Sequence, residues 1–226
     1  MVNWGQIIKS FLNLFLKVNC PLCNRPAEAA MCKYCQRQLQ QYKFVKPEQF
    51  WQSDRVFAWG EYGGTLKRAI AAMKYENHPE LAQPLGYWLG ETWRKSPIYT
   101  NFNKVTVIPI PMYPEKQRKR GFNQAELIAK YFCEYTKLPF QPQGLERIRD
   151  TQAQFSLNPA EREKNLCGAF RLGKAFCRKN LPSKVLLLDD IYTTGATTRA
   201  AEKTLQASGI EVCGIAVIAT TKKTEL

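Results

Sequence analysis

The feature of this sequence that most constrains its fold is an apolar run that ends in two acids and a threonine-rich turn. Residues 185–190 read VLLLDD and residues 191–198 read IYTTGATT. A short continuous apolar run before turn residues is typical of a parallel strand buried on both faces. Similar runs occur at residues 105–110 (VTVIPI) and 212–220. The chain is therefore predicted to be an α/β protein with a mainly parallel twisted sheet and flanking helices.

The rest of the chain supplies the helices and one more strand of this pattern. We expect a strand at residues 55–61 and a long polar loop at 142–167, with a short helix at 159–164. Apolar residues at helical spacing predict helices at residues 66–75, 80–95, 124–135 and 197–208.

The turn after the apolar run suits a phosphorylated sugar. Ligands of open α/β sheets bind at the carboxyl ends of strands. The loop offers backbone N–H groups, hydroxyls and a helix N-terminus to a phosphate, through Thr193, Thr194, Gly195, Ala196, Thr197 and Thr198. Asp189 and Asp190 can accept hydrogen bonds from two vicinal hydroxyls or bind Mg²⁺ through water. The plainer alternative is that the threonines only cap a helix.

Four cysteines form one cluster near the N-terminus. Cys20, Cys23, Cys32 and Cys35 make two C-x2-C pairs, the spacing that gives tetrahedral zinc four thiolates. Two disulfides are the alternative reading. The remaining cysteines (Cys133, Cys167, Cys177 and Cys213) are scattered, which is typical of reduced thiols and of a cytoplasmic location.

The segment before the cysteines has the spacing of an amphipathic helix. Residues 4–18 repeat apolar side chains at helical intervals, and Asn13 and Lys17 argue against a signal peptide. This helix either packs on the zinc module or lies on a partner or the inner face of a membrane. We expect two units: residues 1–45, the helix and zinc module, and residues 46–226, the α/β domain.

A strong positive charge points to a polyanionic partner. The chain has 33 Lys and Arg against 19 Asp and Glu, a formal net charge of +14. Part of the excess lies in a predicted basic loop with Lys116, Arg118, Lys119 and Arg120. These side chains suit a pyrophosphate in the cleft, a nucleic acid, or only solvent.

The combination of motifs resembles a known family. The 185–198 segment is similar to the signature of type I phosphoribosyltransferases. Together with the paired cysteines, the P-x-P after residue 108 and R-G-F-N-Q at residues 120–124, the chain resembles the ComF family, which is tied to DNA uptake in natural competence. Further matching pieces are Leu66-Lys67, Met73-Lys74-Tyr75 and the stretch at 147–165; Glu76-Asn77-His78 departs from the pattern.

The resemblance implies a ligand and roles for particular residues. Asp189 and Asp190 would hold the ribose hydroxyls of phosphoribosyl pyrophosphate (PRPP), and residues 193–198 its 5-phosphate, with Mg²⁺ as a second metal. Residues 147–165 would form a hood over the site, with the candidate residues Arg147, Arg149, Thr151, Gln154 and Arg162.

Two functions remain open at this point. The chain either transfers phosphoribosyl to an unidentified acceptor or only senses PRPP and binds single-stranded DNA. Its partners would then include a competence helicase or other DNA-processing proteins.

Overall fold

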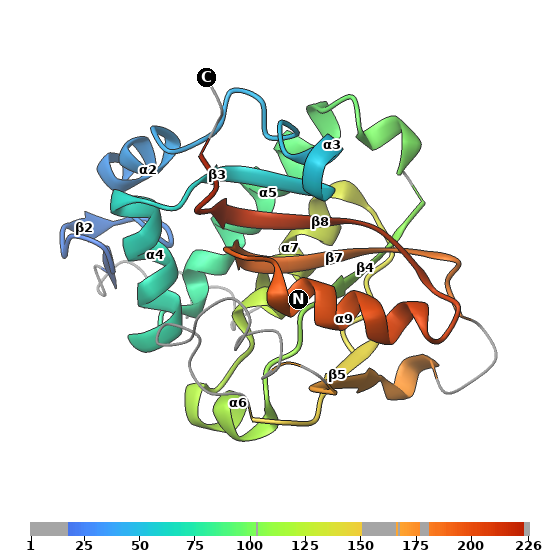
Figure 1. Ribbon diagram of the computed structural model, residues 1–226. Helices are drawn as coiled ribbons and strands as arrows, with labels where there is room; N and C mark the ends of the chain where they lie inside the picture. The colour runs from blue at the N-terminus through green and yellow to red at the C-terminus, as the bar shows by residue number, and fades with distance from the viewer. Residues whose placement is uncertain (1–17, 103, 151–165, 167, 177–180, 224–226) are drawn as a thin grey trace, which may run out of the picture.

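A computed structural model describes residues 18–102, 104–150, 166, 168–176 and 181–223. Its centre is a four-stranded sheet (Figure 1) in the order β3 (Val56–Glu61), β8 (Glu211–Thr220), β7 (Lys184–Tyr192) and β4 (Thr106–Pro109). Every neighbouring pair in this sheet is parallel. The predicted α/β fold is confirmed, and it is consistent with a phosphoribosyltransferase-like arrangement.

Helices cover both faces of the sheet, which explains why its strands are apolar throughout. Leu186 and Leu188 of β7 face one core, which they share with the helices α4 (Gly64–Tyr75), α5 (Ala82–Lys95) and α7 (Gln124–Thr136). Val185 and Leu187 face a second core, which they share with α9 (Ala196–Gln206). Side chains of β7 therefore alternate between the two cores, and the same strand carries the acid pair.

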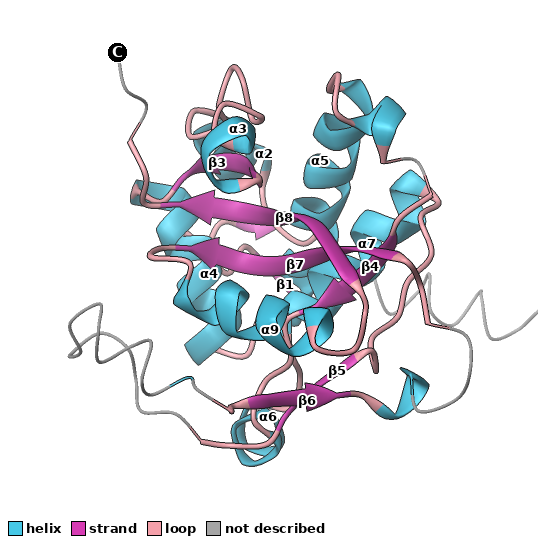
Figure 2. Ribbon diagram, turned by 45° about the vertical axis from the view of Figure 1, so that its right-hand side comes forward, coloured by secondary structure: helices cyan, strands magenta, loops and turns pink. Residues whose placement is uncertain are grey.

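The second core contains an element that we did not predict. Strands β5 (Leu145–Arg147) and β6 (Phe170–Leu172) form an antiparallel ribbon, which contacts α9 (Figure 2). The expectation of a loop throughout residues 142–167 is wrong at β5. Each strand has only three residues, and Leu145 and Phe170 are buried by contacts distant in sequence, so periodicity gives no signal. The predicted short helix at 159–164 lies outside the described residues.

Short elements complete the fold. The N-terminal module contains β1 (Val18–Asn19), β2 (Pro26–Ala27) and α2 (Lys33–Gln40), while α3 (Trp51–Asp54) precedes β3 and α6 (Pro114–Arg120) follows β4. Single 3-10 turns lie at Pro79–Leu81, Tyr99–Asn101 and Lys174–Phe176. Among the described residues, no helix has the length and apolar character needed to cross a membrane.

Candidate functional site

The acid pair lies on β7, at the carboxyl edge of the sheet. Asp189 and Asp190 belong to the strand, as predicted, and it extends two residues beyond the predicted end, to Tyr192. Asp190 is 3% exposed, and its Oδ2 lies 2.7 Å from the Nζ of Lys74, which comes from the last turn of α4. The acid pair therefore has a largely buried lysine as its counter-ion, a contact that the sequence motifs did not indicate.

Burial and charge set the protonation of this group. Burial raises the pKa of Asp189, and the neighbouring Asp190 carboxylate raises it further, whereas Lys74 opposes the shift. Burial alone would lower the pKa of Lys74, but the Asp190 carboxylate raises it above its usual value. Lys74 is thus held in its charged form against the acid pair.

The loop after β7 places a glycine in the left-handed conformation directly before a helix. Gly195 has φ = 75° and is the N-cap of α9. A Cβ atom at this position would lie 2.4 Å from the hydroxyl oxygen of Tyr192. Because a positive φ and this contact both disfavour a side chain, glycine is required here. The Thr198 hydroxyl donates to the Gly195 carbonyl at 2.9 Å, which fixes the first turn of α9.

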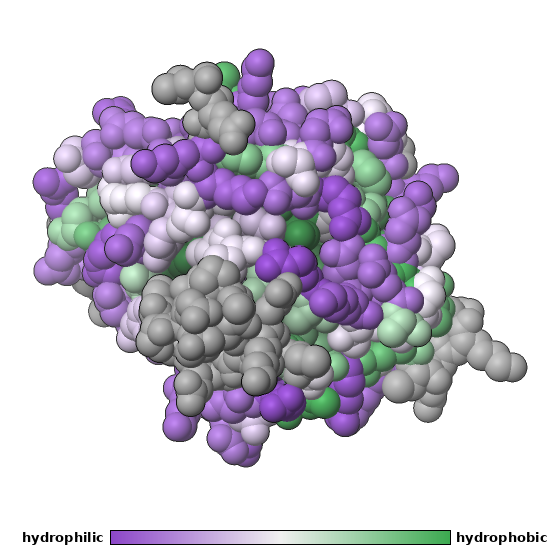
Figure 3. Space-filling view, viewed as in Figure 1, coloured by the Kyte–Doolittle hydropathy of each residue, from purple (hydrophilic) through white to green (hydrophobic). Residues whose placement is uncertain are grey.

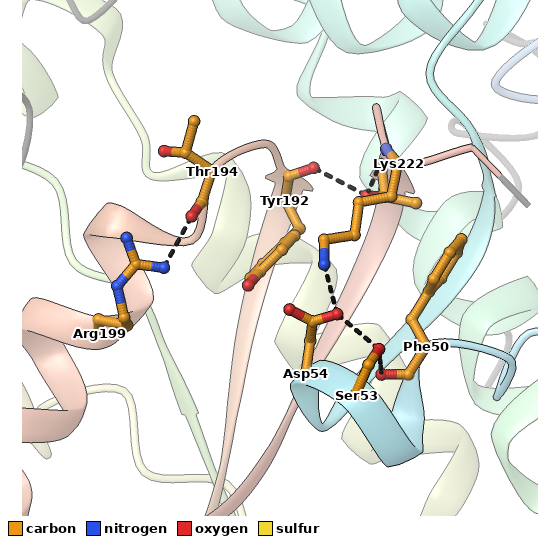
Figure 4. Close-up of polar contacts among 8 residues, drawn as sticks. Phe50, Ser53, Asp54, Tyr192, Thr194, Arg199 and Lys222 are labelled. Carbon is orange, nitrogen blue, oxygen red and sulfur yellow. Dashed lines mark hydrogen bonds and ion pairs between the residues drawn. The ribbon is translucent and has the colours of Figure 1, made fainter. Parts of the chain in front are cut away.

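One hydroxyl of the loop is buried with no partner among the residues that the structure describes. Within the described part of the chain, the Oγ1 atom of Thr194 has no hydrogen-bond partner. The carbonyl of the same residue accepts a hydrogen bond of 2.7 Å from Arg199 (Figure 4). Because a buried hydroxyl is costly to leave unpaired, the arrangement favours a ligand atom at this position.

A polar network around Tyr192 lies on the other side of the loop that follows β7. In Figure 4 the Tyr192 ring lies between Arg199 and Asp54. Lys222 pairs with Asp54 and lies 5.8 Å from the centre of the Tyr192 ring, and Thr220 donates to the Tyr192 carbonyl at 3.0 Å. Although burial alone would raise the pKa of Asp54, Lys222 lowers it. Sequence reasoning missed this network because its partners are far apart in the chain.

The predicted basic loop is a helix. Lys116, Arg118, Lys119 and Arg120 all belong to α6, so the loop prediction is wrong at these residues. Pro114 at the start, basic residues in the last turn and Gly121 after the end at φ = 87° are each signals for a short helix. Lys116 pairs with Asp150 at 2.5 Å. The four cations are therefore presented by one short helix, which follows β4 in the chain.

The R-G-F-N-Q motif joins this helix to the sheet. Arg120 donates to Gln124 at 2.6 Å. The Asn123 side chain accepts from the Ala125 N–H at 3.1 Å, which makes it the N-cap of α7, and it donates to the Ile110 carbonyl at 3.0 Å. The motif thus has a structural role, because it fixes the path from β4 through α6 to α7.

Two of the candidate hood residues are described, and one is close to the acid pair. Arg147 lies on β5, 5.6 Å from the centre of the Phe170 ring. Burial lowers the pKa of Arg147, while the charges of Asp189 and Asp150 oppose that shift. Arg149 is exposed and lies close to Gly168. The candidates Thr151, Gln154 and Arg162 lie outside the described residues.

The four clustered cysteines converge as the spacing predicts. The Sγ atoms of Cys20, Cys23, Cys32 and Cys35 all lie within 4.8 Å of one another, and three of the four residues are buried. Four thiolates about 2.3 Å from a common centre suit tetrahedral zinc, so the donor set fits this metal. The described part of the chain holds free thiols at these positions and no disulfide.

Local turns aim these sulfur atoms at one point. Asn24 adopts φ = 59° after the first pair, and its N–H donates to the Cys20 carbonyl at 2.8 Å. Cys32 is the N-cap of α2. Burial alone would raise the pKa of Cys32, but hydrogen bonds from the Cys35 N–H and the neighbouring thiols lower it to about 7. Burial raises the pKa of the Cys35 thiol in the same cluster, so a bound metal would have to hold these four groups as thiolates.

Comparison with known proteins agrees with the motifs. No protein-family profile matches the chain. Competence protein F of Haemophilus influenzae is 29% identical over 210 residues, which cover 88% of this chain and 90% of the relative. DNA utilization protein YhgH of Salmonella typhimurium is 27% identical over 84% of this chain and 78% of its own length.

A third relative carries the name of the family suggested by the motifs. Competence protein ComFC of Streptococcus pneumoniae is 28% identical over 192 residues, which cover 84% of this chain and 76% of the relative. The resemblance predicted from the sequence is therefore confirmed: the chain is a homologue of competence protein F and ComFC over most of its length.

Proposed function

We propose that this protein binds PRPP at the carboxyl edge of the sheet and acts in DNA uptake. The observation that carries the proposal is the turn after β7, where a glycine in the left-handed conformation begins a helix and a buried threonine hydroxyl has no partner in the described chain. Backbone N–H groups at a helix N-terminus and a free hydroxyl together suit the 5-phosphate.

The acids before the turn suit the sugar of the same ligand. Asp189 and Asp190 would accept hydrogen bonds from the two ribose hydroxyls. Lys74, 2.7 Å from Asp190, keeps a charge beside them. Arg147 and the basic side chains of α6 would attract the pyrophosphate, as arginine donors suit its oxygens. Mg²⁺ bound with the pyrophosphate would offset its charge and assist its departure.

The reaction that fits this site is transfer of phosphoribosyl to an acceptor nitrogen. The nitrogen would attack C1 of the ribose, the bond from C1 to the pyrophosphate oxygen would break, and the acceptor would lose a proton. The chain needs only to position the reactants and to stabilise the charge that leaves. The names of its relatives, competence protein F and DNA utilization protein, support a role in DNA uptake. The cysteine cluster would hold a structural zinc ion.

Titration calorimetry with PRPP and Mg²⁺ tests the ligand. We expect the Thr194→Val variant to bind about tenfold more weakly, because it lacks the hydroxyl for a charged phosphate. Its free energy of unfolding should stay within about 0.5 kcal/mol of wild type, since no described partner loses a bond. Absence of PRPP binding by the wild type would overturn the proposal.

A second Thr→Val variant, outside the turn, controls for the effect of the substitution itself on the protein. Thr204 lies on α9, the helix that follows the turn, and its hydroxyl donates to the Ala200 carbonyl at 3.1 Å. Thr204→Val should keep wild-type PRPP affinity. Release of pyrophosphate in the presence of amines or nucleobases would support transfer, whereas PRPP binding without release would support a sensing role.

A further inference from the structure

A pocket lies between α3 and the residues that follow β8. It has a volume of about 500 Å³, and its lining includes Gln49, Phe50, Ser53, Lys222 and Lys223. We call it the α3 pocket. Among the described residues that line it, none belongs to the acid pair or to the turn at residues 193–198. Because cavities of this size hold small organic ligands, the α3 pocket is a candidate site separate from the proposed PRPP site.

Positive charge exceeds negative charge in the α3 pocket. Lys222 and Lys223 bring two ammonium groups, and Asp54 brings the one carboxylate among the described lining residues. Lys222 pairs with Asp54, which also accepts a hydrogen bond of 2.7 Å from the Ser53 hydroxyl (Figure 4). Lys223 is exposed. Because Lys222 already offsets the carboxylate, one cation is in excess, and the pocket favours an anionic ligand.

A buried amide nitrogen adds a hydrogen-bond donor to the α3 pocket. The Nε2 atom of Gln49 is buried, and no described group accepts a hydrogen bond from it. An unpaired buried donor costs free energy, so a ligand that brings an acceptor is favoured at this position. Gln52 adds an exposed amide to the lining, and Phe50, which is 7% exposed, adds an apolar wall. The ligand should therefore have an organic body with acceptor atoms.

These groups together suit a phosphate attached to a heterocyclic base. Lysine ammonium groups bind phosphate oxygens as point charges, and glutamine amides pair with the hydrogen-bonding edges of bases. In Figure 3 the part of the molecule that carries α3 is mostly hydrophilic, with small apolar areas, as such a ligand requires. We propose that the α3 pocket binds a nucleoside monophosphate, with its phosphate at Lys222 and Lys223 and its base at Gln49.

The α3 pocket lies next to the turn of the proposed PRPP site without being part of it. The Lys222 ammonium group lies 5.8 Å from the centre of the Tyr192 ring, which Figure 4 shows between Asp54 and Arg199. The Lys222 N–H donates to the Thr220 hydroxyl at 3.2 Å, and that hydroxyl donates to the Tyr192 carbonyl at 3.0 Å. Since the two sites share no described lining residue, both should be occupied at the same time.

Titration calorimetry with the full chain and the four ribonucleoside monophosphates tests the proposal. At least one of them should bind, and saturating PRPP and Mg²⁺ should leave its affinity unchanged. Loss of nucleotide binding in the presence of PRPP would place the nucleotide at the turn and overturn the proposal. Ribose 5-phosphate and inorganic phosphate should bind about tenfold more weakly, because they lack the base. Equal affinity for either of them would also overturn it.

Two variants of the pocket identify the residues that bind the nucleotide. Gln49→Leu should weaken binding about tenfold, and the variant should fold normally because the amide nitrogen has no described partner to lose. Lys223→Met should weaken binding about threefold, since an exposed charge contributes less. Lys184→Met is the matched control, because Lys184 begins β7 at the opposite end of the strand and pairs there with Glu211 at 3.5 Å. It should bind like wild type.

A variant of the turn keeps this inference apart from the proposed function. Thr194→Val should weaken PRPP binding and keep the nucleotide affinity of the wild type. Nucleotide binding that is weakened by Thr194→Val and unchanged in both pocket variants would overturn the α3 pocket as the site. A wild type that binds PRPP and none of the monophosphates would overturn this inference alone. A wild type that binds a monophosphate and no PRPP would overturn only the proposed function.

Discussion

The Lys74 ammonium group lies 2.7 Å from the Asp190 carboxylate, and both side chains are largely buried. Lys74 ends α4 and Asp190 lies near the end of β7, so the contact joins two elements at the carboxyl edge of the sheet. The contact neutralises one acid of the pair, which leaves Asp189 as the acid with the raised pKa. The charge of the proposed site is thus set by a residue outside the motif.

Replacing Lys74 should lower the free energy of unfolding, because the buried Asp190 carboxylate loses its counter-ion. Lys74→Met leaves the Asp190 carboxylate without its counter-ion, and removing one partner of a buried pair costs about 3 kcal/mol. Urea denaturation at neutral pH measures this loss. The double variant Lys74→Met with Asp190→Asn should regain part of it, because no unpaired charge remains. A single variant as stable as wild type would show that the pair does not contribute to folding.

The raised pKa of Asp189 predicts a dependence of stability on pH. Because the folded-state pKa lies above the unfolded value, protonation of Asp189 stabilises the fold at low pH, and this stabilisation is lost as pH rises through the folded pKa. Asp189→Asn lacks this titration. The wild type should therefore lose about 1 kcal/mol or more relative to Asp189→Asn between pH 5 and pH 8. Parallel unfolding curves across this range would contradict the shift.

Two glycines with a left-handed backbone separate the cost of that conformation from the cost of a steric clash. Gly195 has φ = 75° and would place a Cβ atom 2.4 Å from the Tyr192 hydroxyl, whereas Gly209 has φ = 79° and no atom within 4 Å. Gly209→Ala should cost about 1 kcal/mol for the left-handed backbone alone. Gly195→Ala should cost roughly 2 kcal/mol and also weaken PRPP binding, because the Tyr192 and Arg199 side chains beside the turn must move as well. Thermal unfolding and calorimetry measure the two effects.

The central sheet could be predicted because its strands carry their own signal. The runs at β4, β7 and β8 are apolar on both faces, and the turn residues after β7 mark the site. The cysteine cluster could also be predicted, because C-x2-C spacing brings metal ligands together through local turns. In each case the information lies within a few neighbouring residues.

The parts that were missed depend on distant partners or on weak local signals. Lys74 meets Asp190, and Asp54 meets Lys222, across more than a hundred residues of chain, so no local pattern identifies either contact. The helix α6 is different, since Pro114 and Gly121 bracket it in the sequence. Its run of charged residues led to the prediction of a ligand-binding loop, although the two boundary residues indicate a helix.

Asn123 offers a test of the structural role of the R-G-F-N-Q motif. Asn123→Ala removes the N-cap of α7 and leaves the buried Ile110 carbonyl without the Asn123 donor, which should cost about 2 kcal/mol. Asn123→Ser should cost less, because serine can still accept from the Ala125 N–H. Chemical denaturation ranks the three proteins. Equal stability of the alanine variant and the wild type would remove the structural role.

Removal of metal should destabilise the N-terminal module. We expect the purified protein to contain one zinc ion per chain and a strong chelator to lower its Tm by on the order of 10 °C, because metal binding contributes to folding. Cys35→Ser should lack the zinc and show no further change with chelator. Cys133→Ser is the matched control, since burial raises the pKa of the Cys133 thiol to about 12 and the residue lies on α7. Zinc retained by Cys35→Ser at the wild-type level would place the metal elsewhere.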